Sequence, residues 1–305
     1  MAVRLLLGGA LDTVASTSTS LSPSPSPSSP VPRPGLRPVL DQLSKSGMVL
    51  HNGSLRVYDV PQCGAAYTLA QLQNVFAAHA VEWNLMGRDR PWWSVLSVAE
   101  YDQGTAPSEN TIRTFYESGR KHVDRVLADL HLAPPLHDMR VLDVGCGLGR
   151  LAHAFARLGA AVACVDQSWN HLRLAQKQAY KRLAAADARR IEHLVTSPDL
   201  IASVGGRRYD VVHSWIALQH AVAPLQAVFM QQMCDVLKSG GKGLLQIPFF
   251  TPMHYTPMDE IRHAFESRGC RVSQWFAFAY LLHGPKKSYH MSHVHVSVAP
   301  NSNTV

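Results

Sequence analysis

In the first half of the chain, apolar residues recur with the spacing that places them on one face of a helix. The spacing predicts a helix that starts at Thr68 and stops at Gly87, and a second helix that Ser108 caps. An aromatic segment, residues 90–96, lies between the two and is expected to form a loop or a short turn. We therefore predict an N-terminal helical cap over residues 48–137.

From residue 138 onward, short apolar runs of strand length alternate with helical segments. The expected strands are residues 140–144, 160–165, 191–195, 209–215, 243–247, 271–278 and 290–298. Alternation of strands and helices predicts a parallel, doubly wound sheet, and the last two strands, joined without a helix, should form an antiparallel pair at its edge. The expected fold is α/β: a mostly parallel, seven-stranded, Rossmann-like sheet with an antiparallel edge strand, over residues 138–300.

Residues 1–47 differ in composition from the rest and are dominated by Ser, Thr and Pro. Such a segment buries too little apolar surface to offset the entropy of ordering it, so a disordered tail is expected. Its basic, briefly apolar start leaves two alternatives: an organelle transit peptide, or a start upstream of the natural one at Met48. No apolar run is long enough to cross a membrane, and a cytoplasmic protein is expected, with organelle import as the alternative.

Composition narrows the class of protein only a little. With 46% hydrophobic and 17% charged residues, the chain has enough apolar content for one large domain with an appended cap. The five cysteines are odd in number and lack a CxxC pair, which argues against a disulfide framework and a cysteine-rich zinc site, and favours a reducing compartment. The net charge of +7 is spread over scattered basic doublets, so it gives little support to a nucleic-acid partner.

A glycine-rich turn follows the first strand of the α/β domain. Gly145, Gly147 and Gly149 stand between that strand and a helix, where glycine lets the backbone approach a ligand closely and the helix N-terminus presents N–H groups. Asp143 precedes the turn, and Asp166 ends the next strand, where a carboxylate can accept both hydroxyls of a ribose. The combination predicts a nucleotide site.

The spacing of the glycines decides which nucleotide is expected. A dinucleotide fingerprint would place its third glycine at position 150, where the chain has Arg150. The arrangement Asp-x-Gly-x-Gly-x-Gly instead resembles the signature of the class I S-adenosylmethionine-dependent methyltransferases. The resemblance extends over most of residues 108–299 and includes residues 115–119, 209–215 and 237–241.

The resemblance implies a role for each matching residue. The backbone of the three glycines would run alongside the methionine and ribose portions of S-adenosylmethionine, and Asp166 would bind the ribose hydroxyls. Asp143 would hold the cofactor ammonium, and Asp199 would lie near the adenine amine, with a turn-forming aspartate as the alternative. The remaining cofactor-binding residues that it implies are Tyr116, Ser214 and Trp215.

His220 is the candidate catalytic residue. It follows the fourth strand of the domain, in a loop at the carboxyl edge of the sheet, and an imidazole there can take a proton from a hydroxyl or an amine. The alternative is that His220 only packs beside the cofactor. His254 and Tyr255 are weaker candidates for the same role.

Several patterns narrow the range of possible methyl acceptors. The tetrad of amide- and adenine-directed members does not follow the fourth strand, and no Pro-Cys nucleophile is placed as in cytosine-directed members. No metal is expected, because polar alternation on an edge strand explains the histidines at 290, 293 and 295. Four cap aromatics are expected to line the pocket, with packing of cap against core as the alternative for the two tryptophans: Trp92, Trp93, Tyr101 and Tyr116.

The resulting hypothesis is an S-adenosylmethionine-dependent methyltransferase that acts on an oxygen or nitrogen atom of a small-molecule metabolite. Three alternatives stay open: a nucleic-acid or protein methyltransferase, a nicotinamide-dependent oxidoreductase, and a protein that binds the cofactor without catalysis. No membrane partner is expected, and the sequence does not specify the oligomeric state.

Overall fold

The computed structural model describes residues 57–60, 65–102, 107–250, 256–281 and 288–299, which all belong to one compact unit, Gln42–Val305. Side chains are described for residues 67–102, 107–247, 256–273 and 294–299. The expectations for residues 1–47, and those for His254 and Tyr255, therefore concern residues outside this description.

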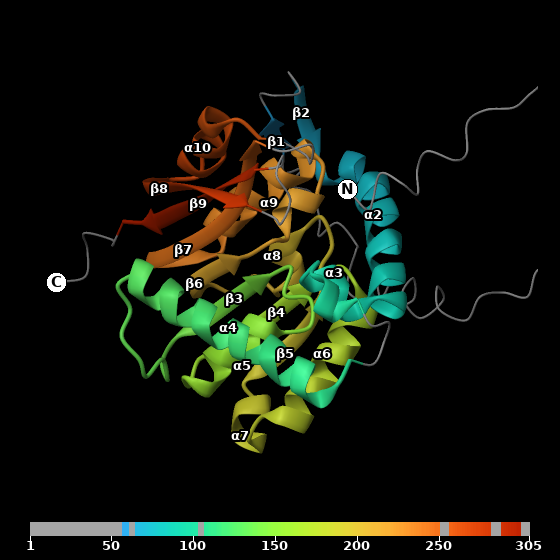
Figure 1. Cartoon of the computed structure of the whole chain (residues 1–305). Helices are drawn as coiled ribbons and strands as arrows, with labels where there is room; N and C mark the ends of the chain where they lie inside the picture. The colour runs from blue at the N-terminus through green and yellow to red at the C-terminus, as the bar shows by residue number, and fades with distance from the viewer. Residues whose placement is uncertain (1–56, 61–64, 103–106, 251–255, 282–287, 300–305) are drawn as a thin grey trace, which may run out of the picture. The chain divides into compact units, whose positions relative to one another are not determined.

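A seven-stranded sheet forms the centre of this unit (Figure 1). Its spatial order is β5-β4-β3-β6-β7-β9-β8. The strands are β3 (Arg140–Val144), β4 (Ala161–Asp166), β5 (Ile191–Val195), β6 (Tyr209–Ser214), β7 (Leu237–Phe250), β8 (Cys270–Leu281) and β9 (Ser288–Val298).

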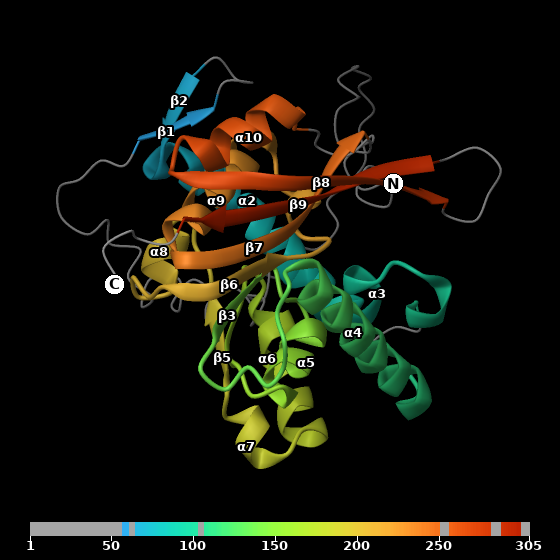
Figure 2. The same cartoon turned by 90° about the vertical axis from the view of Figure 1, so that its left-hand side faces the viewer.

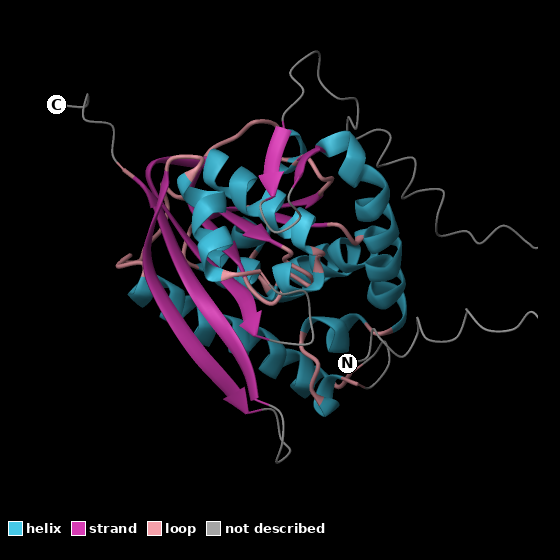
Figure 3. Ribbon diagram, turned by 90° about the horizontal axis from the view of Figure 1, so that it is seen from above, coloured by secondary structure: helices cyan, strands magenta, loops and turns pink. Residues whose placement is uncertain are grey.

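The pairing confirms a mostly parallel sheet with an antiparallel pair at one edge. β5, β4, β3, β6 and β7 pair in parallel, whereas β9 lies antiparallel to both β7 and β8. The strand that runs against the others is thus β9, one position in from the edge. Figure 3 shows the long strands curving side by side.

The strands are buried on both faces, as a parallel sheet requires. Val141 and Val211 pack on one face, and Leu142 and Val212, the next residue of each strand, pack on the other. The first face is covered by helices that include α4 (Glu109–Asp129), α5 (Arg150–Arg157) and α6 (Trp169–Arg182), and the second by helices that include α2 (Leu69–Asp89), α9 (Ala223–Asp235) and α10 (Met258–Glu266). Figure 2 shows the two sets on opposite sides of the sheet.

The order of the sheet reverses at β3, because β4 lies on one side of it and β6 on the other. The connections that leave the carboxyl ends of β3 and β6 therefore turn toward opposite faces, which opens a crevice at that edge of the sheet. The glycine-rich turn follows β3 directly, so the fold places it at this crevice.

The two predicted cap helices are confirmed. Thr68 caps α2 in a capping box, in which its side chain accepts from Gln71 N and the Gln71 side chain accepts from Thr68 N. Ser108 caps α4 by accepting from Thr111 N at 3.1 Å. Among the helices of the described residues, none combines the length and apolarity needed to span a bilayer.

Short elements account for most of the differences from the expected fold. The segment after α2 is a short helix, α3 (Pro91–Val95), because Pro91 fits the first helical position. A two-stranded sheet of β1 (Val57–Val60) and β2 (Ala65–Thr68) precedes α2. The other short helices are α7 (Ala185–Ala188), α8 (Leu200–Ser203), η3 (Ala99–Tyr101) and η4 (Leu218–His220).

The expectation of an unbridged set of cysteines is wrong in this structure. Disulfides join Cys146 to Cys164 and Cys234 to Cys270. The two cysteines of each pair are 18 and 36 residues apart in sequence, and their Cα atoms lie 5.5 and 5.9 Å apart, within the usual range for a disulfide. Parallel strand pairing, which a cysteine count does not reveal, brings the first pair together.

Candidate functional site

The turn between β3 and α5 is built from three glycines in left-handed conformation. Gly145, Gly147 and Gly149 have φ angles of 74°, 53° and 70°, a region that side chains other than glycine rarely adopt. The N–H groups of Gly145 and Cys146 donate to Val165 O at 2.8 and 3.1 Å, which ties the turn to the end of β4. The turn is therefore fixed against the neighbouring strand.

Two of these glycines are also required by close packing. A Cβ atom on Gly145 would lie 2.2 Å from the Cβ of Ala217, and one on Gly147 would lie 2.7 Å from a methyl group of Val95. The loop after β6 and the short helix α3 thus approach the turn from two sides. Only a residue without a side chain leaves space there.

Asp166, the last residue of β4, is oriented by backbone N–H groups. Gly147 N donates to its Oδ2 at 2.9 Å, and Ser168 N donates to its Oδ1 at 2.8 Å. Each carboxylate oxygen has a second lone pair that can accept another hydrogen bond. The side chain faces a cavity, which agrees with the predicted role of binding ribose hydroxyls.

The cavity has a volume of about 780 Å³, part of it open to solvent, and lies at the crevice described above. Four of the predicted cofactor residues line it. Gly145, Gly147 and Asp166 stand at the carboxyl ends of β3 and β4, and Trp215 stands at the end of β6. The predicted base His220, in the loop after β6, also lines the cavity. The rest of the lining is Phe76, His79, Trp83, Ser94, Val95, Val144, Gln167, His171, Thr196, Ile216, Ala217, Leu218, Ala221, Leu225 and Phe229.

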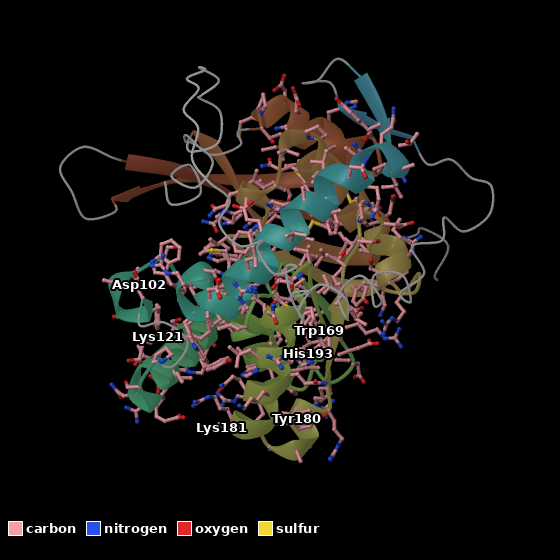
Figure 4. The ribbon with its side chains drawn as sticks, turned by 90° about the vertical axis from the view of Figure 1, so that its right-hand side faces the viewer. Asp102, Lys121, Trp169, Tyr180, Lys181 and His193 are labelled. Atoms are coloured by element: carbon pink, nitrogen blue, oxygen red, sulfur yellow. A yellow bond between two sulfur atoms is a disulfide. The ribbon has the colours of Figure 1, made fainter. Side chains whose placement is uncertain are left out.

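The cap helix α2 forms one wall of the cavity and is docked on the start of α6. Asn84 Oδ1 accepts from Asn170 N at 3.2 Å, and Asn170 Nδ2 donates to Asn84 O at 2.9 Å. Ser168 Oγ donates to Trp83 O at 3.1 Å. Figure 4 looks onto α2, with Trp169, the first residue of α6, labelled below it. The cap is thus attached directly beside the end of β4.

The loop after β6 carries backbone strain next to the cavity. Ile216 has a φ of 58°, which is unfavourable for a β-branched residue. Its N–H donates to Gln246 Oε1 at 2.9 Å, a bond that holds this conformation. Residues held in sparsely populated conformations cluster at functional sites. The strain therefore supports a functional role for the loop.

His220 ends η4 and is placed by contacts on both sides. The Trp83 ring packs edge-on against its ring with centroids 4.8 Å apart, and Gln219 Nε2 lies 3.2 Å from its Nε2. Because an amide nitrogen only donates, His220 Nε2 accepts in this arrangement, and its proton is on Nδ1. The Nε2 lone pair is therefore the site that would take up a proton, and a proton there would replace the Gln219 contact.

Four other predicted residues are not among the residues that line the cavity. Asp143 is buried, its Oδ1 lies 3.5 Å from His213 Nδ1, and its Oδ2 has no hydrogen-bond partner in the structure. Ser214 is buried and donates to Val144 O at 3.0 Å. Asp199 caps α8 by accepting from Ala202 N at 2.9 Å. Gly149 forms the N-cap of α5.

Tyr116 is likewise not among the residues that line the cavity, and it lies beneath the glycine turn. Its hydroxyl donates to Leu148 O at 3.0 Å, and its ring stacks on His153 with centroids 4.3 Å apart. Burial raises the pKa of Tyr116 well above its usual range and lowers the pKa of His153 to about 3. The two rings therefore form a neutral support for the turn, and a direct role of Tyr116 with the cofactor stays a prediction.

The prediction that the cap tryptophans and tyrosines line the pocket is wrong for the cavity seen here. Trp92 and Tyr101 pack edge-on against Phe115, with ring centroids 5.1 and 5.4 Å apart, and Trp93 stacks beneath the Arg90 guanidinium. This aromatic cluster fills its own space between α3 and α4. The aromatic side chains of the cavity are instead Phe76, Trp83, Trp215 and Phe229.

Sequence reasoning missed several polar residues of the cavity. Gln167 follows Asp166 directly, and Thr196 follows β5, so both stand at carboxyl ends of strands, which was the available signal. His79 and Trp83 are four residues apart on α2, the spacing that places two side chains on one helix face. The apolar periodicity of α2 placed Trp83 on the inward face, but it did not show that this face borders the cavity.

His171 and Ser94 form a buried pair at the cavity wall. Ser94 Oγ donates to Pro91 O at 2.9 Å, so it accepts from His171 Nε2 at 2.7 Å. Burial lowers the pKa of His171, although Asp166 acts in the opposite direction. His171 is therefore neutral, and Asp166 is the one acidic residue among the described cavity residues.

No group of three or more His, Cys, Asp or Glu side chains within the described residues has the arrangement of a metal site. His295 of β9 is buried, and burial lowers its pKa. The side chains at 290 and 293 lie outside the description.

Residues 141–241 match the model of a family described as methyltransferase domain. This segment runs from β3 to β7 and includes the glycine turn, Asp166 and His220. The match therefore covers the cavity-lining residues other than those of α2 and α3, and leaves out the cap.

Curated relatives share the same part of the chain. The ubiquinone biosynthesis O-methyltransferase of Dinoroseobacter shibae is 31% identical over 167 residues, which are 54% of this chain and 58% of that protein. The human mitochondrial protein of the same name is 35% identical over 107 residues, 35% of this chain and 28% of the human one. The alignments thus span about half of these relatives or less.

Solved structures with a similar arrangement include magnesium protoporphyrin IX methyltransferase from Synechocystis PCC 6803 with bound S-adenosylmethionine. It is 18% identical, with a TM-score of 0.49, and the match covers 69% of this chain and 95% of that one. The glycopeptide N-methyltransferase complexed with sinefungin is 15% identical, with a TM-score of 0.46, over 60% of this chain and 94% of that one.

Proposed function

We propose that this chain, which contains a class I S-adenosylmethionine-dependent methyltransferase domain, transfers a methyl group to a hydroxyl oxygen of a small, uncharged ring compound. The observation that carries the proposal is the composition of the cavity. The glycine turn and Asp166 lie at one part of its wall, and an imidazole set among aromatic and aliphatic side chains lies at another.

The residues present fit the cofactor. Asp166 offers lone pairs to two ribose hydroxyls, while its own orientation is fixed by Gly147 N and Ser168 N. Side chains at positions 145 and 147 would fill space beside the turn, so the glycines keep the backbone accessible. Asp143 Oδ2, buried and without a partner in the structure, is a suitable acceptor for an ammonium group reached through the turn. When bound, S-adenosylmethionine supplies a methyl group already activated on a sulfonium.

His220 would take the proton of the acceptor. Its neutral ring lines the cavity, and Trp83 packs against it, which limits its rotation. In methyl transfer the acceptor oxygen would bond to the methyl carbon as the carbon–sulfur bond breaks, and the hydroxyl proton would pass to His220 Nε2 in place of the Gln219 contact. The enzyme's other contribution is alignment of the oxygen in line with that bond.

The walls of the cavity indicate what kind of acceptor fits. Phe76, Trp83, Leu225 and Phe229 from α2 and α9 are apolar or aromatic, and no lysine or arginine is among the described lining residues. A phosphate or carboxylate would find no cation there, whereas a flat ring can pack against the aromatic faces. The relatives' names place their reaction on oxygen in ubiquinone biosynthesis, which supports oxygen as the acceptor atom.

The test is methyl transfer from S-adenosylmethionine labelled in its methyl group to a panel of uncharged phenols, with amines and a single-stranded oligonucleotide for comparison. We expect label to reach phenols and not the oligonucleotide. His220→Ala should lower kcat about 100-fold or more, the lower range for a lost general base, and leave the affinity for S-adenosylhomocysteine within about twofold.

The exposed His137 provides the matched control, because it precedes the amino end of β3, whereas the cavity lies at the carboxyl ends of the strands, and His137→Ala should leave kcat unchanged. Equal turnover by wild type and His220→Ala would remove His220 from the mechanism. Transfer to the oligonucleotide or to amines alone would contradict the proposed acceptor.

A further inference from the structure

Gln167 is the polar cavity residue that stands next to the ribose-binding carboxylate. It follows Asp166 at the end of β4 and lines the same cavity. Its side-chain amide has an oxygen that accepts and a nitrogen that donates. A protein group that binds the amide oxygen therefore leaves the amide nitrogen to face a ligand.

The cap holds the oxygen end of that amide. His79, on α2, lies with its Nδ1 3.1 Å from Gln167 Oε1. The contact joins two segments 88 residues apart in sequence, one from the cap and one from the sheet. It is part-buried, so water competes for it less than at an open surface.

The protonation of His79 is fixed by Trp83. The indole Nε1 of Trp83 lies 3.1 Å from His79 Nε2, and an indole N–H only donates. His79 Nε2 must therefore accept, which places the ring proton on Nδ1. The Nδ1–H then donates to Gln167 Oε1, and the amide nitrogen of Gln167 is left to donate toward a ligand.

We propose that His79 is a positioning residue for the cofactor: by holding Gln167 Oε1, it presents the Gln167 amide N–H groups to the nucleoside that Asp166 binds. The inference rests on the proposed function, because the nucleoside is that of S-adenosylmethionine. Helix α2 thereby contributes to cofactor affinity although it carries no residue of the glycine motif. Trp83 also packs against His220, so one face of α2 supports both the cofactor part and the acceptor part of the cavity.

The experiment is a double-mutant cycle measured by calorimetric binding of S-adenosylhomocysteine to the full chain. The variants are His79→Leu, Gln167→Ala and the combination of both. We expect each single variant to weaken binding about five- to tenfold, the range for one lost, well-oriented hydrogen bond. Because His79 acts through Gln167, the double variant should bind within about twofold of Gln167→Ala.

A rescue variant and a second ligand make the test specific. The Asn side-chain nitrogen occupies about the place of His Nδ1, so His79→Asn should recover affinity to within about threefold of wild type. Binding of 5′-methylthioadenosine, which has the nucleoside but no amino acid part, should be weakened by His79→Leu to the same degree.

If the double variant loses affinity by the product of the two single-variant factors, the inference is overturned, because His79 would then act independently of Gln167. Unchanged binding by His79→Leu would overturn it as well. If the folded wild type does not bind S-adenosylhomocysteine, the proposed function itself fails, and the inference fails with it. Thermal unfolding of each variant shows whether it is folded.

Discussion

At the scale of single residues, the cavity depends on glycines at positions where a Cβ atom would not fit. Gly145 combines a left-handed backbone with contact to Ala217, and each condition alone would disfavour a side chain. The nearest atom to an added Cβ there is itself a Cβ, fixed to the loop backbone, so it cannot swing away. The two effects should therefore add.

We predict that Gly145→Ala weakens binding of S-adenosylhomocysteine more than tenfold. It should also lower the free energy of unfolding by more than the 1–2 kcal/mol typical of a left-handed alanine. Gly205→Ala is the matched control, because Gly205 has a φ of 63° but no atom within 4 Å of an added Cβ. Calorimetric binding and denaturant unfolding of both variants are the measurements. Equal losses of affinity in the two would contradict the role of the contact.

A second prediction at this scale concerns pH. Burial lowers the pKa of His153 to about 3 in the folded chain, compared with about 6.5 in an unfolded one. Between these values the unfolded chain binds the proton and the folded chain does not, so stability is present above pH 6.5 and is lost as the pH falls below it.

His153→Phe keeps a ring against Tyr116 and removes this titration. Between pH 7.5 and 5 the free energy of unfolding of the variant should fall less than that of wild type. The difference below pH 6.5 is at most about 1.4 kcal/mol per pH unit, the value for one proton. Parallel curves for the two proteins, from denaturant unfolding at each pH, would show that His153 is not held neutral.

At the scale of elements, the cavity wall formed by α2 depends on how closely this helix packs on α6. Gly87 of α2 is buried, and a Cβ added there would lie 2.7 Å from His171 Nδ1 and 2.8 Å from Ser168 Oγ. His171 is itself buried and paired with Ser94, so it has little freedom to move.

Gly87→Ala separates helix propensity from packing, because the two have opposite signs. Alanine is favoured over glycine within a helix by about 0.8–1.0 kcal/mol, so the variant would be more stable if propensity decided the outcome. We predict instead a loss of about 1–3 kcal/mol from overpacking, measured by denaturant unfolding. A stabilised variant would mean that α2 is not docked on α6 as described.

Sequence patterns were sufficient for the elements whose two faces differ in burial. The periodicities of α2 and α4 and the caps Thr68 and Ser108 predicted both helices closely. The start of β7 was predicted less closely, since the strand begins at Leu237 and not at residue 243, and it includes Gly240 and Gly241. A glycine pair stops a helix and is tolerated at a strand irregularity, and local pattern does not separate the two cases.

At the scale of the whole molecule, the sheet half of the cavity was predictable and the cap half was not. Gly145, Gly147, Asp166 and Trp215 stand at strand ends, which the order of a doubly wound sheet brings to one edge. The contribution of α2 depends on tertiary docking. The cap aromatics Trp92 and Tyr101 pack against Phe115 instead, and the pairing of Cys146 with Cys164 likewise follows from strand order.

The central claim is that the cavity binds S-adenosylmethionine through Asp166, and the most direct test is calorimetric titration of the full chain with S-adenosylhomocysteine. The wild type should bind it with micromolar affinity, Asp166→Ala should bind more than tenfold more weakly, and NADH should give no heat of binding. A folded wild type that binds NADH and not S-adenosylhomocysteine would contradict the account and support a nicotinamide-dependent oxidoreductase.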